Sequence, residues 1–206
     1  MTGTVALVRE AVASVGIGRP VAERLAAYLD LLLRANEEMN LVSGREAVPE
    51  NLVSRHLLDA LEALPLLPAP AGRRLRLLDV GSGGGFPAVP LLVVREDVEG
   101  VLVESTGKKA RFLEATVRAL GLTARVVNAR FPGPALQLMR NALPCDLLTT
   151  RAVAGAGEIV RQARPALVRG AVALLWTTEP LLGDLRRSLP GAQVDFRKSP
   201  GADRRG

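Results

Sequence analysis

The residues best placed to do chemistry are the glycines that follow a short apolar run. Residues Leu75–Val80 are bounded by charge and glycine, which is typical of a buried parallel strand. Gly81, Gly83 and Gly85 come next, and glycines let a backbone turn sharply and pass close beneath a ligand. Pro87 suits the first turn of a helix. The sequence therefore predicts a strand, a glycine turn and a helix N-terminus, which together form a nucleotide cradle.

A carboxylate follows this cradle at the position where nucleotide-binding folds hold the ribose. The apolar run Val101–Glu104 predicts a second strand that ends in an acid. The acid lies about 20 residues beyond the glycines, which is the usual spacing for a residue that binds ribose hydroxyls. Glu104 could also simply end a strand, but the glycine turn favours ribose binding.

Two cofactors fit the glycine turn. The acid-x-Gly-x-Gly-x-Gly form of residues Asp79 to Gly85, with Ser82 inside it, is seen in S-adenosylmethionine (SAM) methyltransferases. The spacing Gly83-x-Gly85-x-x-Ala88 instead fits the dinucleotide fingerprint, although this alternative leaves Asp79 unused. A tight turn without a ligand is the third alternative. The pattern favours SAM over NAD.

Repeating strand and helix patterns predict the elements that position the turn. Such βα units imply a doubly wound, mostly parallel α/β sheet with right-handed crossovers. Ligands bind these sheets at the carboxyl ends of the strands. Besides the two strands already named, the expected strands are Ala124–Asn128, Asp146–Thr149, Ala171–Trp176 and, more weakly, Ala192–Phe196. The expected helices are Pro87–Val94, Gly107–Leu120, Pro134–Asn141, Gly157–Leu167 and Leu181–Leu189.

The first seventy residues contain helix patterns and no strand candidates. Helices are expected at Thr4–Ser14, Val21–Met39 and Pro49–Leu64, ahead of a proline-rich connector. We therefore divide the chain into an N-terminal helical cap (residues 1–70), an α/β domain (residues 71–197) and a polar tail (residues 198–206) that is expected to be disordered.

Charge is distributed unevenly along the chain, whose formal net charge is +6. Residues 1–70 carry six Arg and nine acids, whereas residues 71–206 carry 21 Lys or Arg and 12 acids. A basic α/β domain attracts a polyanion such as nucleic acid. The alternative is a general bias toward surface arginine, since only three residues are lysine.

Several classes of protein are not expected from the composition. Cys145 is the only cysteine, which excludes an internal disulfide, and with one histidine it supplies too few ligands for a metal site. No nucleophile elbow is present, so a Ser-His-Asp hydrolase is not expected. No apolar run reaches the roughly 18 residues of a membrane span, and no signal peptide is visible. We expect a cytoplasmic protein.

Several stretches beyond the glycine turn match one known family. The most specific part is a glycine loop followed by Phe-Pro, with a His-x-x-Asp segment upstream. The matching stretches are Asn40–Leu41, Arg55–Asp59, Leu78–Pro87 with Pro90, Glu104–Phe112, Ala129–Arg130 and Thr150–Ala152. In these residues the chain resembles the small-subunit (16S) ribosomal RNA guanine-N7 methyltransferases of the RsmG (GidB) type. The resemblance covers most of residues 20–180.

This resemblance implies a Rossmann-like methyltransferase that binds SAM and methylates N7 of a guanine in small-subunit ribosomal RNA. Arg151 stands at the position of the family's pocket arginine and is the expected catalytic residue, which could stack on the guanine or bond its O6. Lys108, Lys109 and His56 are expected to contact the substrate. The expected cofactor-binding residues are Asp79, Gly81, Ser82, Gly83, Gly85, Phe86, Glu104, Ser105, Thr106, Arg130, Phe131 and Arg151.

Three of these assignments have structural alternatives. Lys108 and Lys109 could be a solvated helix start. Arg151 could form a scaffolding ion pair with Asp79, Glu104 or Glu158. His56 and Asp59 could form a packing pair, because residues three apart on a helix can touch.

Two positions differ from the family's pattern. Thr177-Thr178 stand where the family has Lys-Gly, and Phe131-Pro-Gly stands where acidic residues commonly follow Arg130. Two other functions therefore stay open: a diverged member that binds SAM or RNA with little or no turnover, and a SAM methyltransferase that acts on a small molecule. The expected partner is ribosomal RNA or the small ribosomal subunit, and we expect a monomer without a metal.

Overall fold

The core of the protein is a parallel sheet. A computed structural model describes residues 2–69, 72–151, 155–176, 182–188 and 193 of the chain. Within these ranges five strands pair in the order β3-β2-β1-β4-β5, all in parallel. This arrangement confirms the predicted doubly wound α/β class. The strands are β1 Leu75–Val80, β2 Val98–Val103, β3 Ala124–Val127, β4 Cys145–Arg151 and β5 Leu167–Trp176.

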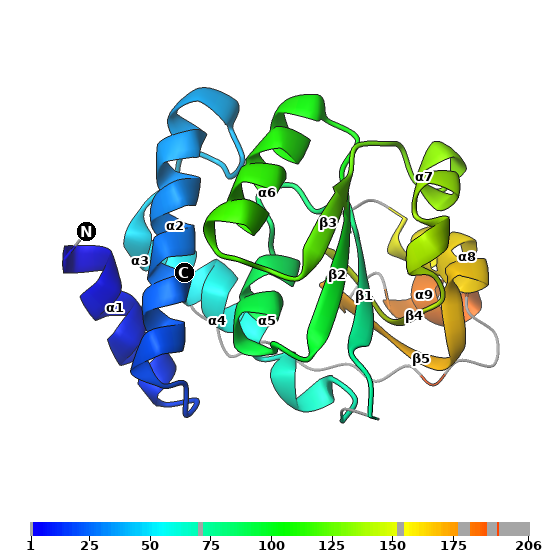
Figure 1. Ribbon diagram of the computed structural model, residues 1–206, viewed down its shortest axis with the longest axis horizontal. Helices are drawn as coiled ribbons and strands as arrows, with labels where there is room; N and C mark the ends of the chain where they lie inside the picture. The colour runs from blue at the N-terminus through cyan, green and yellow to red at the C-terminus, as the bar shows by residue number, and fades with distance from the viewer. Residues whose placement is uncertain (1, 70–71, 152–154, 177–181, 189–192, 194–206) are drawn as a thin grey trace.

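Helices cover both faces of the sheet (Figure 1). Helices α1 to α6 lie on one face, and α7 to α9 lie on the other. The helices are α1 Thr2–Ala13, α2 Arg19–Met39, α3 Pro49–Asn51, α4 Leu58–Leu61, α5 Ala88–Val94, α6 Gly107–Ala119, α7 Gly133–Leu138, α8 Ala156–Ala163 and α9 Leu182–Ser188. A π-helical turn forms at Leu52–Leu57, and short 3-10 helices form at Leu64–Leu66, Arg140–Ala142 and Arg164–Ala166.

Alternate residues of the central strands enter two separate cores. Leu77 and Leu147 pack into the larger core beneath the helices of the cap and α5. Leu78 and Leu148, one position further along each strand, pack into a second core with residues of α7 and α8. Successive side chains of a strand point to opposite faces, and a parallel sheet covered by helices buries both. This explains why apolar residues of β1 face both sides of the sheet, with Arg76 and Asp79 as its charged residues.

The order of the strands creates a topological switch point between β1 and β4. The chain runs outward from β1 through β2 to β3 and then crosses back to β4 on the other side of β1. Ligands of open α/β sheets bind at such a reversal, outside the carboxyl ends of the strands. Asp79 and Thr149 pair in register near this edge. The predicted glycine turn therefore lies where the topology itself places a ligand site.

The N-terminal cap packs directly on the α/β part of the chain. One side of α2 buries Leu25, Tyr28, Leu29 and Leu32, which recur at the spacing of a helix face. These side chains belong to the same apolar cluster as Leu102 of β2. The cap and the sheet are therefore joined by a common core in addition to their linker.

The third predicted helix, Pro49–Leu64, is wrong as a continuous α-helix. The structure divides it into α3, the π-helical turn and α4, which ends at Leu61. The π-helical turn carries His56, and such turns are frequent at functional sites. Apolar periodicity indicates a helix here, but it does not distinguish α from π hydrogen bonding, because the side-chain spacing is nearly the same.

Other predicted bounds differ from the structure by a few residues. β2 begins at Val98 instead of Val101, because Gly100 interrupts the apolar pattern but pairs in the sheet. β5 begins at Leu167 instead of Ala171, and α8 is correspondingly shorter than predicted. The predicted strand Ala192–Phe196, apart from Gln193, lies outside the described residues, as do the tail 198–206 and Thr177-Thr178. Within the described ranges, no helix has both the length and the apolar character that a membrane span needs.

If the cap and the sheet share one core, they unfold together. Leu29 is fully buried in that core, so Leu29→Ala is expected to lower the free energy of unfolding by about 2–5 kcal/mol. Chemical denaturation followed by far-UV circular dichroism and by fluorescence of Trp176, the only tryptophan, should give one shifted transition with both probes. Two separate transitions would contradict a shared core and would support independent units at 1–70 and 71–197.

Candidate functional site

The chain turns at the carboxyl end of β1 on three glycines with positive φ. Gly81, Gly83 and Gly85 have φ angles of 77°, 54° and 100°, a region that residues with a Cβ enter only at a cost. The N–H of Gly81 donates to the carbonyl of Val103 at 2.9 Å, which anchors the turn to β2. A Cβ added at Gly83 would meet nothing closer than a backbone oxygen at 3.8 Å. The turn can therefore accept a ligand above Gly83.

Glu104 follows β2 and is fixed by the turn itself. Its Oε2 accepts a hydrogen bond from the N–H of Gly83 at 2.9 Å, and its Oε1 accepts one from the N–H of Thr106 at 2.7 Å. The side chain of Asn128 donates to the backbone carbonyl of Glu104 at 2.8 Å and so links the end of β3. Carboxylate oxygens can each accept a further hydrogen bond, so this geometry suits a pair of hydroxyl donors.

Asp79 is a buried acid at the end of β1. Thr149 donates its hydroxyl to Oδ1 at 2.6 Å, whereas Oδ2 has no hydrogen-bond partner among the described residues. Burial raises the pKa of Asp79 to about 6, against the opposite effect of the Thr149 hydrogen bond. A buried oxygen without a donor is unfavourable in a folded protein. Asp79 therefore marks a place that a polar group of a ligand, or water, would complete.

Aromatic side chains of the cap hold Phe86 beside the glycine turn. The rings of Tyr28 and His56 each lie with their centroid 5.2 Å from that of Phe86, Tyr28 edge-on and His56 tilted. The hydroxyl of Tyr28 donates to the carbonyl of Gly84 at 2.7 Å. Phe86 is only 7% exposed as a result. Its packing explains the residue without a ligand, so its apolar contact with SAM stays a prediction.

Arg151 ends β4 and is held by the cap. Its Nη2 lies 3.1 Å from Oδ2 of Asp59 and donates to the carbonyl of Arg55 at 2.9 Å. The indole of Trp176, which pairs with Arg151 in the sheet, donates to the carbonyl of Asp59 at 3.2 Å. The π-helical turn and α4 thus fix the direction of the guanidinium at the carboxyl edge.

The predicted ion pairs of Arg151 were wrong. Asp59 forms the pair instead of Asp79, Glu104 or Glu158. Asp79 and Glu104 are bound by O–H and N–H groups of their own neighbours, and Glu158 pairs with Arg161 on α8. Sequence spacing could not reveal the pair, because Asp59 is far from Arg151 in the chain and approaches it only when the cap docks.

His56 does not form the predicted packing pair with Asp59. Its Nε2 lies 3.2 Å from Oε2 of Glu46, and Arg55 pairs with the other oxygen of the same carboxylate at 3.1 Å. Burial lowers the pKa of His56, as does the nearby Arg151, against the opposite effect of Glu46. His56 is therefore mostly neutral at pH 7, which suits a ring packed against Phe86.

The remaining predicted cofactor residues gather at the same edge. Ser105 and Thr106 are exposed between β2 and α6, next to the fixed carboxylate of Glu104. Arg130 is exposed after β3, and Phe131 beside it is half-buried against the second core. The fold thus brings the ends of β1, β2, β3 and β4 together, as predicted, while the ligand contacts of these residues stay predictions.

Lys108 and Lys109 lie in the first turn of α6. Lys108 is exposed and Lys109 is half-buried, and neither has a hydrogen bond or ion pair with another described residue. A cation at a helix N-terminus is disfavoured by the helix dipole. Their position therefore does not stabilise the fold and fits a role in contacting an anion.

Three residues of the site were not recognised in the sequence: Tyr28, Asn128 and Thr149. Tyr28 sits on the leucine-rich face of α2, and a lone hydroxyl on an apolar helix face is the pattern that could have revealed it. Thr149 and Asn128 come at or just after strand ends, where polar residues were expected to matter, but only the strand register shows which group each one binds.

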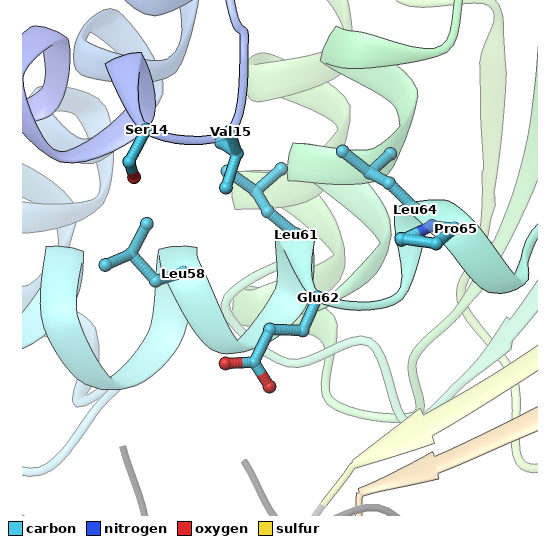
Figure 2. A pocket seen from close by; sticks show the side chains of 7 residues that line it. All are labelled: Ser14, Val15, Leu58, Leu61, Glu62, Leu64 and Pro65. Atoms are coloured by element: carbon cyan, nitrogen blue, oxygen red, sulfur yellow. The ribbon is translucent and has the colours of Figure 1, made fainter. Parts of the chain in front are cut away.

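One groove lies on the cap and is lined by residues other than the predicted site residues. It has a volume of about 400 Å³ and runs between the end of α1 and α4 (Figure 2). It contains no predicted cofactor or substrate residue. In the described part of the chain, no group of three His, Cys, Asp or Glu side chains could hold a metal ion.

Comparison with known proteins identifies one family. A family model described as GidB, rRNA small subunit methyltransferase G, matches residues 21–181. The ribosomal RNA small subunit methyltransferase G of Acidiphilium cryptum is 33% identical over 184 residues, which are 89% of this chain and 81% of that protein. The protein of the same name from Stenotrophomonas maltophilia is 38% identical over 170 residues, 82% of this chain and 74% of that protein.

One solved structure shows the fold at low sequence identity. Precorrin-6y C5,15-methyltransferase from Geobacter metallireducens matches with a TM-score of 0.51 and 15% identity, over 63% of this chain and 66% of that chain. At this identity the likeness concerns the architecture of the sheet and not the substrate.

Gly85 is expected to be the least replaceable glycine of the turn. A Cβ there would lie 2.7 Å from Cγ2 of Val89 and 3.1 Å from the hydroxyl of Tyr28. Gly121 is the matched control, because its φ is +60° but an added Cβ meets nothing within 4 Å. We expect Gly121→Ala to lower the free energy of unfolding by about 1–2 kcal/mol and Gly85→Ala by about 1–3 kcal/mol more. Calorimetry should also show weaker SAM binding for Gly85→Ala alone. Equal losses of stability would contradict the clash.

Proposed function

The chain belongs to the GidB family, and we propose that it transfers a methyl group from SAM to N7 of a guanine in small-subunit ribosomal RNA. The observation that supports this most is the fixed carboxylate of Glu104 beside an open glycine turn. Both lie at the carboxyl edge of the sheet, where Arg151 ends β4. These groups lie at the switch point of the sheet, which is where α/β folds bind nucleotides.

The residues present suit SAM as the cofactor. Glu104 would accept the ribose hydroxyls, since both of its oxygens are already oriented by backbone N–H groups. Asp79 has a buried oxygen that needs a donor, and SAM carries an α-ammonium and an adenine amino group that could supply one directly or through water. Arg130 and Phe131, which follow β3, would border the adenine. SAM, when bound, supplies an activated methyl group.

The methyl transfer to N7 needs little acid–base catalysis from the protein. N7 of guanine is a lone-pair acceptor that carries no proton, so its methylation requires no general base. This agrees with the described site, in which the ring of His56 is bound to Glu46 and packed against Phe86. The protein accelerates such a transfer mainly by aligning the reactants and excluding water.

Arg151 is the residue that we propose orients the guanine. Its guanidinium is held from one side by Asp59 and by the carbonyl of Arg55. A guanidinium fixed in this way can stack its face on a purine or donate to O6. RNA must present the base unstacked for this contact to form. Lys108 and Lys109 would bind phosphates at the rim. The cytoplasm, where ribosomes assemble, is the expected location.

The proposed activity is tested with purified protein, labelled SAM and two substrates: small-subunit ribosomal RNA and a pool of small metabolites. We expect methyl incorporation into the RNA only, and mass mapping should place it at N7 of a guanine. SAM at 100 times its Kd should raise the free energy of unfolding by about 2.7 kcal/mol, whereas NAD should not. Labelled metabolites, or SAM binding without turnover on RNA and on small ribosomal subunits, would refute the proposal in favour of one of the two alternatives.

The Asp59–Arg151 pair gives a second prediction for the same activity. Arg151→Lys should lower kcat at least about tenfold, or ~1.4 kcal/mol, because a lysine cannot reproduce the planar fork. Asp59→Asn should lower kcat by less, and the two effects should not add if Asp59 acts through Arg151. Glu99→Gln is the matched control, because it breaks an ion pair with Arg76 on β1 and β2 away from the site.

The readout that separates positioning from general damage is the SAM dissociation constant. We expect it to change by less than about threefold in Asp59→Asn and in Glu99→Gln, whereas Arg151→Lys can also weaken SAM binding because Arg151 is itself a predicted cofactor residue. Additive losses in the double variant, or a loss of SAM affinity in Asp59→Asn, would show that Asp59 supports the fold rather than the reactive arginine.

A further inference from the structure

The whole net charge of the protein is concentrated in one segment of 38 residues, from Ser105 to Ala142. This segment holds seven Lys or Arg and a single acid, Glu114, so its net charge is +6. The whole chain has 27 Lys or Arg and 21 Asp or Glu. The other residues are therefore balanced, with 20 of each sign. A general bias toward arginine would not confine the excess charge to one segment.

In the fold this segment forms one margin of the sheet. It comprises α6, β3 and α7, and β3 is the outermost strand on that side of the described sheet (Figure 1). Lys108, Arg111 and Arg118 follow one another on α6 at intervals of three and seven residues, which places them on one stripe of the helix. The buried side chains of α6 occupy the opposite side. The stripe therefore faces solvent.

We name six cations of this segment the basic edge: Lys108, Lys109, Arg111, Arg118, Arg130 and Arg140. Five of them are exposed and Lys109 is half-buried. The seventh cation, Arg125, is excluded because it donates to the carbonyl of Leu138 and serves the fold.

None of the six has an acidic partner among the described residues, although Glu114 lies on the same helix. Elsewhere in the described chain, arginines commonly pair with acids, as in Arg24–Glu96 and Arg76–Glu99. Unneutralised like charges on one margin repel one another and lower the stability of the fold. Their concentration is explained when an anionic partner neutralises them.

The basic edge leads directly to the candidate site. Its Lys108 is the second residue of α6, which begins immediately after Glu104–Thr106, and Arg130 follows β3. A guanidinium nitrogen of Arg111 and the side-chain oxygen of Asn128 lie 3.5 and 3.6 Å from the position that a Cβ on Gly107 would occupy. Because Asn128 also binds the carbonyl of Glu104, the cations of α6 are contiguous with the residues that enclose the cofactor site.

We propose that the basic edge is the surface on which the phosphate backbone of the RNA substrate docks, guiding an unstacked guanine to the carboxyl edge of the sheet. This inference rests on the proposed function and adds the path of the RNA. Helix α6 has 13 residues and is about 20 Å long, enough to contact several consecutive phosphates. Exposed cations without acid partners bind phosphate without base specificity, which suits a substrate whose sequence is read only at the target.

The test compares two triple variants with equal loss of charge. The edge variant replaces Arg111, Arg118 and Arg140 with glutamine. The control variant replaces Arg9 on α1, Arg34 on α2 and Arg169 on β5 with glutamine. These three arginines are exposed and have no acidic partner among the described residues. Binding of a small-subunit ribosomal RNA transcript is measured by filter retention at several salt concentrations, and SAM binding is measured by calorimetry.

For the edge variant we expect RNA affinity to fall at least about tenfold at low salt, and the slope of log Kobs against log salt to decrease by about 2, because roughly three phosphate contacts are lost. The control variant should keep the wild-type slope, and both should bind SAM within about twofold of wild type. KM for RNA should rise in the edge variant while single-turnover methylation at saturating RNA is retained.

Equal weakening in both triple variants would show diffuse attraction and overturn the inference, as would a wild-type slope in the edge variant. If the wild-type protein neither binds nor methylates ribosomal RNA, the proposed function fails first. Methylation that is normal in the edge variant on naked RNA and on small ribosomal subunits, with unchanged KM, would leave the proposed function intact and refute the docking surface.

Discussion

The cofactor site depends on the contact between the N-terminal cap and the glycine turn. The buried hydroxyl of Tyr28 fixes the carbonyl of Gly84, and the rings of Tyr28 and His56 enclose Phe86. On the other side, the N–H of Gly83 binds Glu104. A turn made of glycines has many accessible conformations. Without these contacts it would lose more entropy on binding a ligand, and we therefore infer that the cap supports cofactor binding by ordering the turn.

The same cap also orients the group that we propose faces the guanine. Asp59 pairs with Arg151, and Trp176 donates to the carbonyl of Asp59, so α4, β4 and β5 meet at one point. The neutral His56 and the acid Glu46 complete this region. The cap therefore connects the turn after β1 with the end of β4, the two strands that flank the switch point. RNA contacts are also expected along the basic edge, which begins beside Glu104.

Much of the architecture could be predicted because the strands are apolar on both faces and are separated by recognisable helices. β1 was predicted with its observed bounds, and β2 was shortened only because Gly100 interrupts its pattern. The π-helical turn around His56 could not be predicted, since the choice between α and π hydrogen bonding depends on tertiary packing. The predicted site residues gather where glycines and strand ends mark the carboxyl edge, whereas Tyr28 was missed because an apolar helix face predicts burial and not a specific partner.

The sequence alone determined the parallel α/β class, the glycine turn with its acid, and the sign and position of the excess charge. These follow from local pattern and composition, which need no knowledge of distant contacts. Only the tertiary structure decided that Asp59 is the partner of Arg151, that His56 binds Glu46, and that Glu104 is held by the turn itself. Such pairs join residues far apart in the chain. Which side chains come within hydrogen-bonding distance is decided only when the helices pack on the sheet.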